Sequence, residues 1–299
     1  MVPRFSGALV SNLLCGEQVL VTGAAGFIGR HLCRRLMELQ ATVVAVDCYT
    51  PDSTEVLPGF IKMDITSYDE LRAIDVVDPK LVFHLAAVGA TDPFLPVDDA
   101  LRVNVLGTVN LLKVLDGRAQ VAVARTAAER NPSSPYAVSK AAAWGFCDMY
   151  ARTKGWPLRG AMIFQCYGSG QSAGNVLPAA LEAALSGNEF LLSPGEQIRD
   201  WVSVEDVVSG LLAVAQSELA PAESLEIGTG VGTSLRETVQ MLFDLVGGKR
   251  IPSLGALPYR PGEEMRVVAD SGRTERLTGW RARTGLAEGL RALVSAGAQ

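Results

Sequence analysis

Short apolar runs alternate with amphipathic helical patterns along the first two thirds of the chain. The run Gln18–Thr22 precedes the segment Phe27–Gln40, in which leucine and isoleucine recur every three or four residues and form one buried stripe. A second run, Thr42–Val46, ends at Asp47. Strands that alternate with helices are typical of a parallel sheet, so we expect an α/β fold. Five further runs predict strands: Gly59–Ile65, Lys80–Leu85, Gln120–Thr126, Leu158–Phe164 and Ser224–Ile227.

The first predicted strand runs directly into a glycine-rich turn. Gly23, Gly26 and Gly29 are spaced by three residues and lead into the helical pattern. In such a strand–turn–helix context, glycines let the backbone approach a pyrophosphate at the N-terminus of the helix. Asp47, at the end of the second strand, suits the two ribose hydroxyls of NAD and repels a 2′-phosphate. The sequence therefore predicts a dinucleotide site that takes NAD, with NADP as the less favoured cofactor.

A tyrosine and a lysine stand four residues apart at the start of an alanine-rich helical pattern, residues 136–153. At this spacing Tyr136 and Lys140 share one helical face. An ammonium group beside a phenol favours the phenolate, so the pair suits a general acid/base that works on an alcohol or a ketone. Taken alone, the same spacing also fits an ordinary solvent-exposed pair.

Together, these features resemble the extended short-chain dehydrogenase/reductases, in particular the NAD-dependent epimerase/dehydratase family that acts on nucleotide sugars. The resemblance runs from Gln18 to about Leu293. It implies a Rossmann-type, doubly wound parallel sheet with a smaller C-terminal α/β substrate-binding domain. The implied division gives residues 1–165 and 203–228 to the dinucleotide-binding domain, and residues 166–202 and 229–299 to the nucleotide-sugar-binding domain.

The resemblance also assigns cofactor contacts beyond the glycine turn. Asp64 and Ile65, at the end of the third strand, would border the adenine, although Asp64 also suits the N-cap of a following helix, residues 67–76. Asn104, within a long predicted helix over 98–115, would keep the active-site helix and strand in register, or is simply a buried polar residue satisfied by backbone. The expected cofactor residues are Gly23, Gly26, Phe27, Ile28, Gly29, Asp47, Asp64, Ile65, Leu85, Ala86, Ala87, Asn104, Tyr136 and Lys140.

The segment between the fifth strand and the catalytic helix departs from the resembled family. Members of that family carry a Val-Tyr-Gly turn and a longer loop here, and both are missing from this chain. Thr126 is still expected as the catalytic hydroxyl that orients a sugar oxygen towards Tyr136, with Ser133 or Ser134 as the substitute if the short loop folds back.

Two neighbours of this threonine are also atypical. The dehydratases of the family carry an Asp-Glu pair directly after it, where this chain has Ala127 and Ala128. Because alanine has no titratable group, elimination of water by the family's route is disfavoured. Arg125 replaces a small hydroxyl residue; it could bind a substrate carboxylate or phosphate, or pair with Glu129.

The C-terminal third carries the substrate contacts that the resemblance implies. Arg199 and Arg260 would make charge-assisted hydrogen bonds to the diphosphate, and Glu263 would meet a ribose hydroxyl. Arg199 could alternatively pair with Asp200 or Glu196. The expected substrate residues are Gln165, Asn175, Val176, Arg199, Arg260 and Glu263.

Composition limits the partners, metals and location that we expect for this protein. The chain has 299 residues and a net charge of −5 with no basic runs, which argues against nucleic-acid binding. Five scattered cysteines without CxxC pairs fit free thiols in a reducing cytoplasm, and two histidines make a His-based metal site improbable, so we expect no metal. No apolar run is long enough to cross a bilayer. By resemblance, we expect a homodimer that packs the 98–115 and 136–153 helices into a four-helix bundle.

These residues favour NAD-dependent oxidoreduction at C4 of a nucleotide-diphosphate hexose. Tyr136 would take the proton of the C4 hydroxyl, and return of hydride to the other face of the 4-keto sugar would make the enzyme a 4-epimerase. A 4-ketoreductase acting on a 4-keto-6-deoxy sugar would use the same groups for one half-reaction. A third possibility is a protein that binds NAD and a nucleotide sugar without turnover, against which the retention of Tyr136 and Lys140 argues.

Overall fold

A seven-stranded parallel sheet organises the larger lobe of the molecule. The computed structural model describes residues 14–50, 57, 59–92, 94–247 and 251–297. The strands are ordered β3-β2-β1-β4-β5-β6-β9, and every neighbouring pair is parallel. Because this order reverses direction at β1, a crevice opens at the carboxyl edge between β1 and β4. The strands are β1 (Gln18–Thr22), β2 (Thr42–Asp47), β3 (Phe60–Lys62), β4 (Leu81–His84), β5 (Gln120–Thr126), β6 (Leu158–Ile163) and β9 (Ser224–Ile227).

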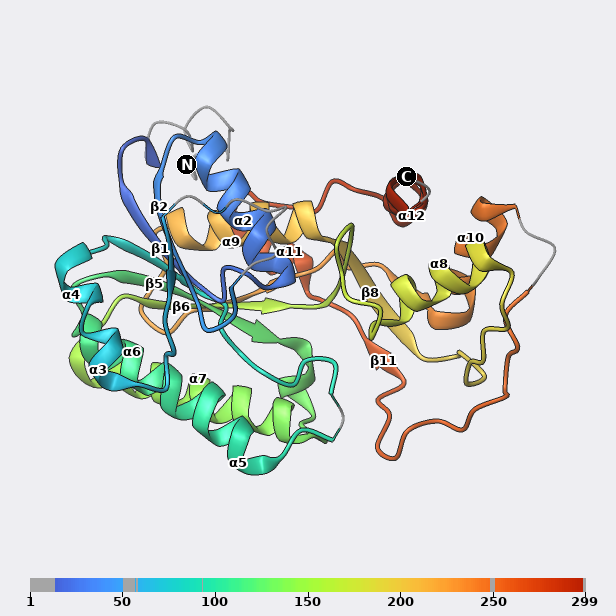
Figure 1. Cartoon of the computed structure of the whole chain (residues 1–299), viewed down its shortest axis with the longest axis horizontal. Helices are drawn as coiled ribbons and strands as arrows, with labels where there is room; N and C mark the ends of the chain where they lie inside the picture. The colour runs from blue at the N-terminus through green and yellow to red at the C-terminus, as the bar shows by residue number, and fades with distance from the viewer. Residues whose placement is uncertain (1–13, 51–56, 58, 93, 248–250, 298–299) are drawn as a thin grey trace.

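Helices cover both faces of this sheet (Figure 1). Helices α2 (Phe27–Glu38) and α9 (Val204–Gln216) pack on one face, where their apolar residues join those of β1, β5 and β6 in one core cluster. Helices α6 (Thr108–Leu115) and α7 (Pro135–Lys154) pack on the other face in a second cluster. The expected Rossmann-type, doubly wound arrangement is confirmed.

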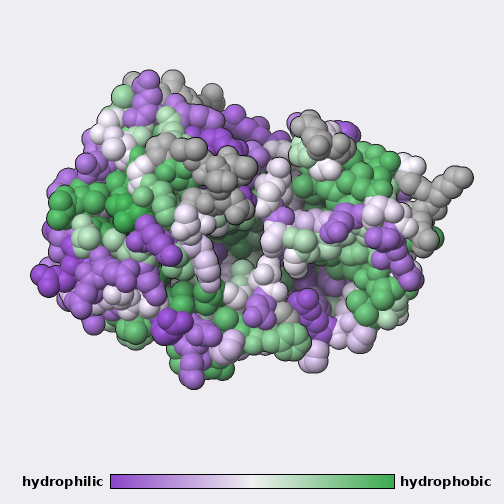
Figure 2. All heavy atoms as spheres, in the orientation of Figure 1, coloured by the Kyte–Doolittle hydropathy of each residue, from purple (hydrophilic) through white to green (hydrophobic). Residues whose placement is uncertain are grey.

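A smaller lobe forms the other end of the molecule (Figure 1). Its sheet has β8 at the centre, with β7 and β11 parallel to it and β10 antiparallel. Figure 2 shows the surface hollowed between the two lobes. The strands are β7 (Gln165–Tyr167), β8 (Ile198–Ser203), β10 (Gly232–Ser234) and β11 (Arg266–Val267), and the helices are α8 (Val176–Ser186), α10 (Leu235–Val246) and α12 (Leu286–Gly297). Helix α11 (Ser271–Thr278) packs against β9 of the larger sheet.

The strand predictions agree with the structure to within a few residues, but two helices differ from expectation. The 98–115 segment starts as α5 (Val97–Asp99) and widens into a π-helix, η1 (Ala100–Gly107), before α6 begins. The expected single helix over 67–76 is two short helices, α3 (Tyr68–Leu71) and α4 (Ile74–Val77). No helix in the described part of the chain is both long and apolar enough to cross a membrane.

A chain of buried side chains links β1, β4 and α6. His84 is 1% exposed, and its Nδ1 and Nε2 atoms lie 2.7 Å and 2.8 Å from the hydroxyl oxygens of Thr22 and Thr108. Burial, with Lys140 nearby, lowers the pKa of His84 to about 3, so the ring is neutral at physiological pH. This histidine is therefore a structural connector behind the crevice.

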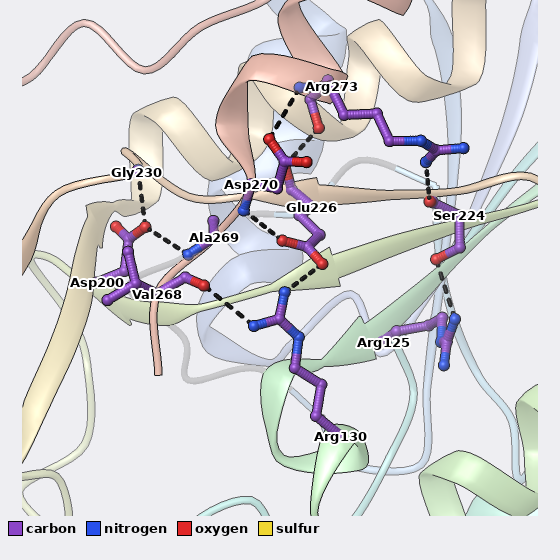
Figure 3. A network of polar contacts seen from close by, with 11 residues as sticks. Arg125, Arg130, Asp200, Ser224, Glu226, Gly230, Val268, Ala269, Asp270 and Arg273 are labelled. Atoms are coloured by element: carbon purple, nitrogen blue, oxygen red, sulfur yellow. Dashed lines mark hydrogen bonds and ion pairs between the residues drawn. The ribbon is translucent and has the colours of Figure 1, made fainter. Parts of the chain in front are cut away.

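Asp200 joins the smaller sheet to the segment that returns from β9 (Figure 3). Its carboxylate is fully buried and accepts hydrogen bonds from the backbone N–H groups of Thr229, Gly230 and Ala269 at 2.8, 2.8 and 3.2 Å, and from the Thr229 hydroxyl at 2.6 Å. One side chain thus satisfies four donors from two segments that are distant in sequence.

We expect Asp200→Ala to destabilise the protein by about 3 kcal/mol or more, because it leaves several buried donors without acceptors. Urea denaturation of wild type and variant measures the difference. Asp244→Ala is the matched control, since the Asp244 carboxylate accepts an exposed hydrogen bond from Gln240 of the same helix. Equal, small losses in the two variants would contradict this account of Asp200.

Candidate active site

The glycine turn lies against the end of β4 with no room for side chains. A Cβ on Gly29 would come within 2.1 Å of the Gly23 carbonyl oxygen, and one on Gly23 within 2.6 Å of the Ala86 nitrogen. Gly23 also has a φ of +72°, which glycine adopts readily. Helix α2 begins directly after Gly26, which has no side chain to cap the first N–H groups. These features fit a pyrophosphate at the helix N-terminus.

Asp47 lies at the carboxyl end of β2 beside this turn. Its Oδ2 accepts a hydrogen bond from the Ala25 N–H at 3.0 Å, and its Oδ1 accepts one from the Tyr49 N–H at 3.1 Å. A carboxylate offers about four acceptor sites, so two such bonds leave capacity for ribose hydroxyls. The β2–β3 register also places Lys62 opposite Asp47, a basic neighbour that the linear sequence does not reveal.

The remaining expected cofactor residues follow the same sheet edge. Asp64 is not the cap of a helix: Ser67 caps α3, and the Asp64 carboxylate instead accepts from the Thr66 N–H at 2.8 Å. The Ile65 side chain packs against Gly107 of η1, so closely that a Cβ on Gly107 would lie 2.7 Å from it. This contact joins the sheet edge to η1.

Asn104 holds the active-site elements together. Its side-chain amide exchanges hydrogen bonds with the backbone N–H and C=O of Val88 at 2.8 and 3.0 Å, and donates to the Ser139 hydroxyl at 2.9 Å. Ser139 in turn donates to the Tyr136 carbonyl at 2.9 Å. Asn104 thus positions the segment after β4 and the first turns of α7, and its direct contact with the cofactor stays a prediction.

Tyr136 and Lys140 occupy the first two turns of α7. Pro135 opens the helix, and the Ser134 hydroxyl caps it by accepting from the Ala137 N–H at 3.2 Å. The alternative that Ser133 or Ser134 substitutes for Thr126 stays a prediction. The Lys140 side chain is buried, whereas Tyr136 is partly exposed, as a group that meets a substrate must be.

The protonation of this pair differs from the sequence expectation. Burial and the negative charge of Glu129 raise the pKa of Tyr136 to about 12, and a hydrogen bond with the Thr126 side chain acts in the opposite direction. Burial lowers the pKa of Lys140, although Glu129 raises it. The expectation that Lys140 lowers the tyrosine's pKa was therefore wrong, because burial disfavours the phenolate and Glu129, which sequence reasoning considered only as a partner of Arg125, adds to this effect.

The short segment after β5 folds into one 3₁₀ turn, η2 (Ala127–Arg130). Glu129 accepts hydrogen bonds from Arg125 Nε and Nη2 at 2.9 and 2.7 Å, and from the Thr126 N–H at 2.9 Å. The Thr126 hydroxyl accepts from the Ala128 N–H at 3.3 Å, which completes a capping box. Of the alternatives for Arg125, the structure shows the pairing with Glu129.

The expected substrate residues lie on the smaller lobe. Arg199 forms an ion pair with Glu263, not with Asp200 or Glu196, and donates to the Glu264 carbonyl at 2.7 Å. Arg260 is exposed. A Cβ on Gly262 would lie 3.6 Å from Ser133, so the segment that contains Arg260 and Glu263 reaches the loop before α7.

Three further substrate candidates lie at the start of the smaller lobe. Asn175 precedes α8, and its side-chain amide donates to the Ser172 carbonyl at 3.2 Å, while Val176 is the first residue of that helix. Gln165 is partly buried in β7. In chemical terms, the cationic segment reaches the loop before α7, and Asn104 connects α7 to the segment after β4, on which the glycine turn packs.

We expect Gly29→Ala to abolish NAD binding, because the new methyl group would meet backbone atoms that cannot yield. Fluorescence titration with NAD and the NAD content of the purified protein measure the loss. The control is Gly285→Ala, where nothing lies within 4 Å of the added Cβ. Wild-type NAD affinity in Gly29→Ala would show that the dinucleotide lies elsewhere.

Comparison with known proteins agrees with this geometry. The family model described as "NAD dependent epimerase/dehydratase family" matches residues 19–228. The chain is 30% identical to a UDP-glucose 4-epimerase of Mycolicibacterium smegmatis over 91% of this chain and 96% of that protein. It is 28% identical to a GDP-6-deoxy-D-mannose reductase of Pseudomonas aeruginosa over 93% of this chain and 96% of that protein.

Among solved structures, MoeE5 in complex with UDP-glucuronic acid and NAD superposes with a TM-score of 0.84 at 32% identity, over 94% of this chain and 99% of that chain. The glycine turn, Asp47 and the Tyr136/Lys140 pair supply the groups that such a protein needs. The chain thus belongs to the NAD-dependent epimerase/dehydratase family, as an NAD-dependent nucleotide-sugar enzyme of the extended short-chain dehydrogenase/reductase type.

Proposed function

We propose that this enzyme is a 4-epimerase of a nucleotide-diphosphate hexose. The observation that carries the proposal is that Thr126 is hydrogen-bonded to Tyr136 and that Glu129 acts on both Tyr136 and Lys140, with Ala127 and Ala128 in place of the acid pair of dehydratases. A hydroxyl, a phenol and an ammonium are the groups required to move one proton on and off a sugar oxygen.

Each of these groups has a distinct task. Tyr136, as the phenolate, accepts the proton of the C4 hydroxyl when the sugar is oxidised and returns it when the 4-keto sugar is reduced. Thr126 hydrogen-bonds the same sugar oxygen and orients it towards the phenol. Lys140 supplies positive charge next to both. The glycine turn, Asp47 and the edge of β4 would hold NAD, which would accept hydride from the sugar and return it.

The nucleotide half of the substrate is assigned to the smaller lobe. Arg199 and Arg260 would bind the diphosphate and Glu263 a ribose hydroxyl, with Gln165, Asn175 and Val176 around the sugar and base. The proximity of Gly262 to Ser133 supports this assignment, because the segment that carries Arg260 and Glu263 then lies next to the loop before the catalytic helix. The five cysteines, all within the described residues and all free, support a cytoplasmic location.

A 4-ketoreductase of a 4-keto-6-deoxy sugar is the second candidate. The raised pKa of Tyr136 favours it, because the phenol is then in the protonated form that reduction of a ketone requires. The shortened loop also suits a specialised deoxysugar enzyme.

The two candidates are separated by the fate of isotopic label. The holoenzyme is incubated with a panel of nucleotide sugars and 4-keto-6-deoxy sugars in the presence of deuterated NADH. For a 4-epimerase we expect inversion at C4 without label uptake, whereas label at C4 from external NADH identifies a reductase. Neither inversion nor label with any sugar would overturn the enzymatic proposal and favour binding without turnover.

Tyr136→Phe is the diagnostic variant for this assay. It should remove at least about 99% of turnover, since general acid/base groups contribute about 10²–10⁴-fold. Affinity for the nucleotide sugar, measured by calorimetry, should stay near wild type, because the phenol does not contact the diphosphate. Retained turnover would exclude the tyrosine from the mechanism.

We also propose a homodimer through η1, α6 and α7. Along α7, Val138, Ala142, Gly145, Phe146 and Met149 form one exposed, largely apolar stripe, and Leu101 and Leu106 of η1 are about half exposed. An apolar stripe on paired helices is typical of a packed helical interface.

Phe146→Glu should therefore shift the protein to a monomer, because it places a charge in this interface. Light scattering coupled to size exclusion gives the mass in solution. Val76→Glu is the control, since Val76 is 91% exposed on α4, outside the proposed interface. A wild-type protein that is monomeric at micromolar concentration would exclude the dimer.

A further inference from the structure

Two oppositely directed ion pairs hold the single turn that replaces the family's active-site loop. Glu129 points inward to Arg125, with 1% and 14% of the two side chains exposed. Arg130 points outward, pairs with Glu226, donates to the Val268 carbonyl at 3.0 Å and lies over the Phe164 ring at 4.8 Å. Figure 3 shows Arg130 bridging from η2 towards β9 and the segment after β11.

The ion pair between Glu129 and Arg125, the inner pair, keeps a charge buried. Both oxygens of Glu129 are engaged, one by the Arg125 fork and the other by the Thr126 N–H. Arg125 itself stacks on the Trp144 ring of α7, 4.5 Å from its centroid, and donates to the Ser224 hydroxyl at 3.0 Å. Taking such a pair out of water is costly unless its remaining hydrogen bonds are satisfied, as they are here. The pair thus joins β5, η2, α7 and β9 directly behind the catalytic groups.

We propose that Glu129, held in place by Arg125, is a positioning residue that fixes Thr126 and sets the proton affinity of the Tyr136/Lys140 pair. The proposal rests on the proposed acid/base role of Tyr136. Its physical content is that a fixed negative charge disfavours the phenolate and favours the charged ammonium. Glu129 therefore keeps Tyr136 in its protonated form at neutral pH, so proton abstraction from the alcohol, which needs the phenolate, is the pH-limited step.

Among the described residues, Glu129 is the one carboxylate that acts on the pair. The groups that act on Tyr136 and Lys140 are Glu129, Thr126, Arg125 and Cys147. From β4, His84 faces Lys140 but is neutral. Among the charged side chains of the other elements packed on α7, Arg102 of η1 pairs with Asp99, Arg159 of β6 donates to carbonyls of α9, and Lys113 of α6 is exposed.

The test is Glu129→Gln, which keeps an acceptor oxygen for the Thr126 N–H but removes the charge. The ionisation of Tyr136 is followed by the ultraviolet absorbance of tyrosinate in the NAD-loaded protein, after subtraction of the same titration in a Tyr136→Phe background. We expect the pKa of Tyr136 to fall by about one unit or more. Because alcohol oxidation needs the phenolate, the acid limb of its pH–rate profile should move to lower pH by the same amount.

Two variants separate charge from geometry. Glu129→Asp retains the charge on a shorter stem, so the acid limb should stay near its wild-type pH while kcat falls, because Thr126 loses its support. Arg125→Gln removes the positive charge that partly offsets the charge of Glu129, so the acid limb of the pH–rate profile should move to higher pH. Arg273→Gln, which removes the exposed pair with Glu223 on the far side of Ser224 (Figure 3), should leave the pH profile unchanged.

An unchanged tyrosinate titration in folded Glu129→Gln would overturn the proposal, and so would a shift of equal size in Arg273→Gln. If Glu129→Gln does not fold, the direction of the Arg125→Gln shift decides, and a shift to lower pH overturns the proposal. Because the titration needs no sugar, it also separates this inference from the proposed function. A shifted titration in a protein that turns over no nucleotide sugar would leave the positioning role standing while the 4-epimerase assignment fails.

Discussion

The close contact between the glycine turn and the end of β4 is the constraint on which the rest of the structure depends. Because a Cβ at Gly23 or Gly29 would collide with backbone atoms, β1, the turn and α2 can approach β4 only with glycine at these positions. That approach opens the crevice at the reversal of strand order, where a dinucleotide can lie across the carboxyl ends of the strands. The catalytic helix and the smaller lobe are then arranged around this crevice.

Buried polar side chains with several partners each hold these parts in place. Asn104 connects the segment after β4 to α7, Asp200 connects the smaller sheet to the segment after β9, and Glu129 connects β5 to its following turn. A buried group of this kind is costly when a partner is lost, so it specifies one arrangement where apolar contacts would permit several. The site therefore owes its geometry to polar connections and its stability to the two apolar layers on either face of the large sheet.

Much of this was predictable from sequence, for identifiable reasons. β-branched runs and the spacing of Gly23, Gly26 and Gly29 are local signals, and they gave the strands and the turn. The Tyr136/Lys140 pair was equally predictable, because the spacing of one helical turn sets its geometry. The partner of Arg199 could not be predicted, because it depends on how segments distant in sequence meet. The effect of Glu129 on Tyr136 could not be predicted either, because it depends on how deeply a charge is buried. The same holds for Lys62 opposite Asp47, which only strand register reveals.

The π-helical winding of η1 determines which residues of the continuous segment α5–η1–α6 face inward and which face outward. Asn104 and Thr108 both face inward, to Ser139 and His84, while Leu101 and Leu106 face outward. In an α-helix each residue turns the next by about 100°. A one-residue insertion or deletion between Leu101 and Asn104 would thus rotate Leu101 relative to the anchored amide, and one between Asn104 and Leu106 would rotate Leu106. Length in this segment is as constrained as residue identity, which makes it a poor place for natural variation and a sensitive point for protein engineering.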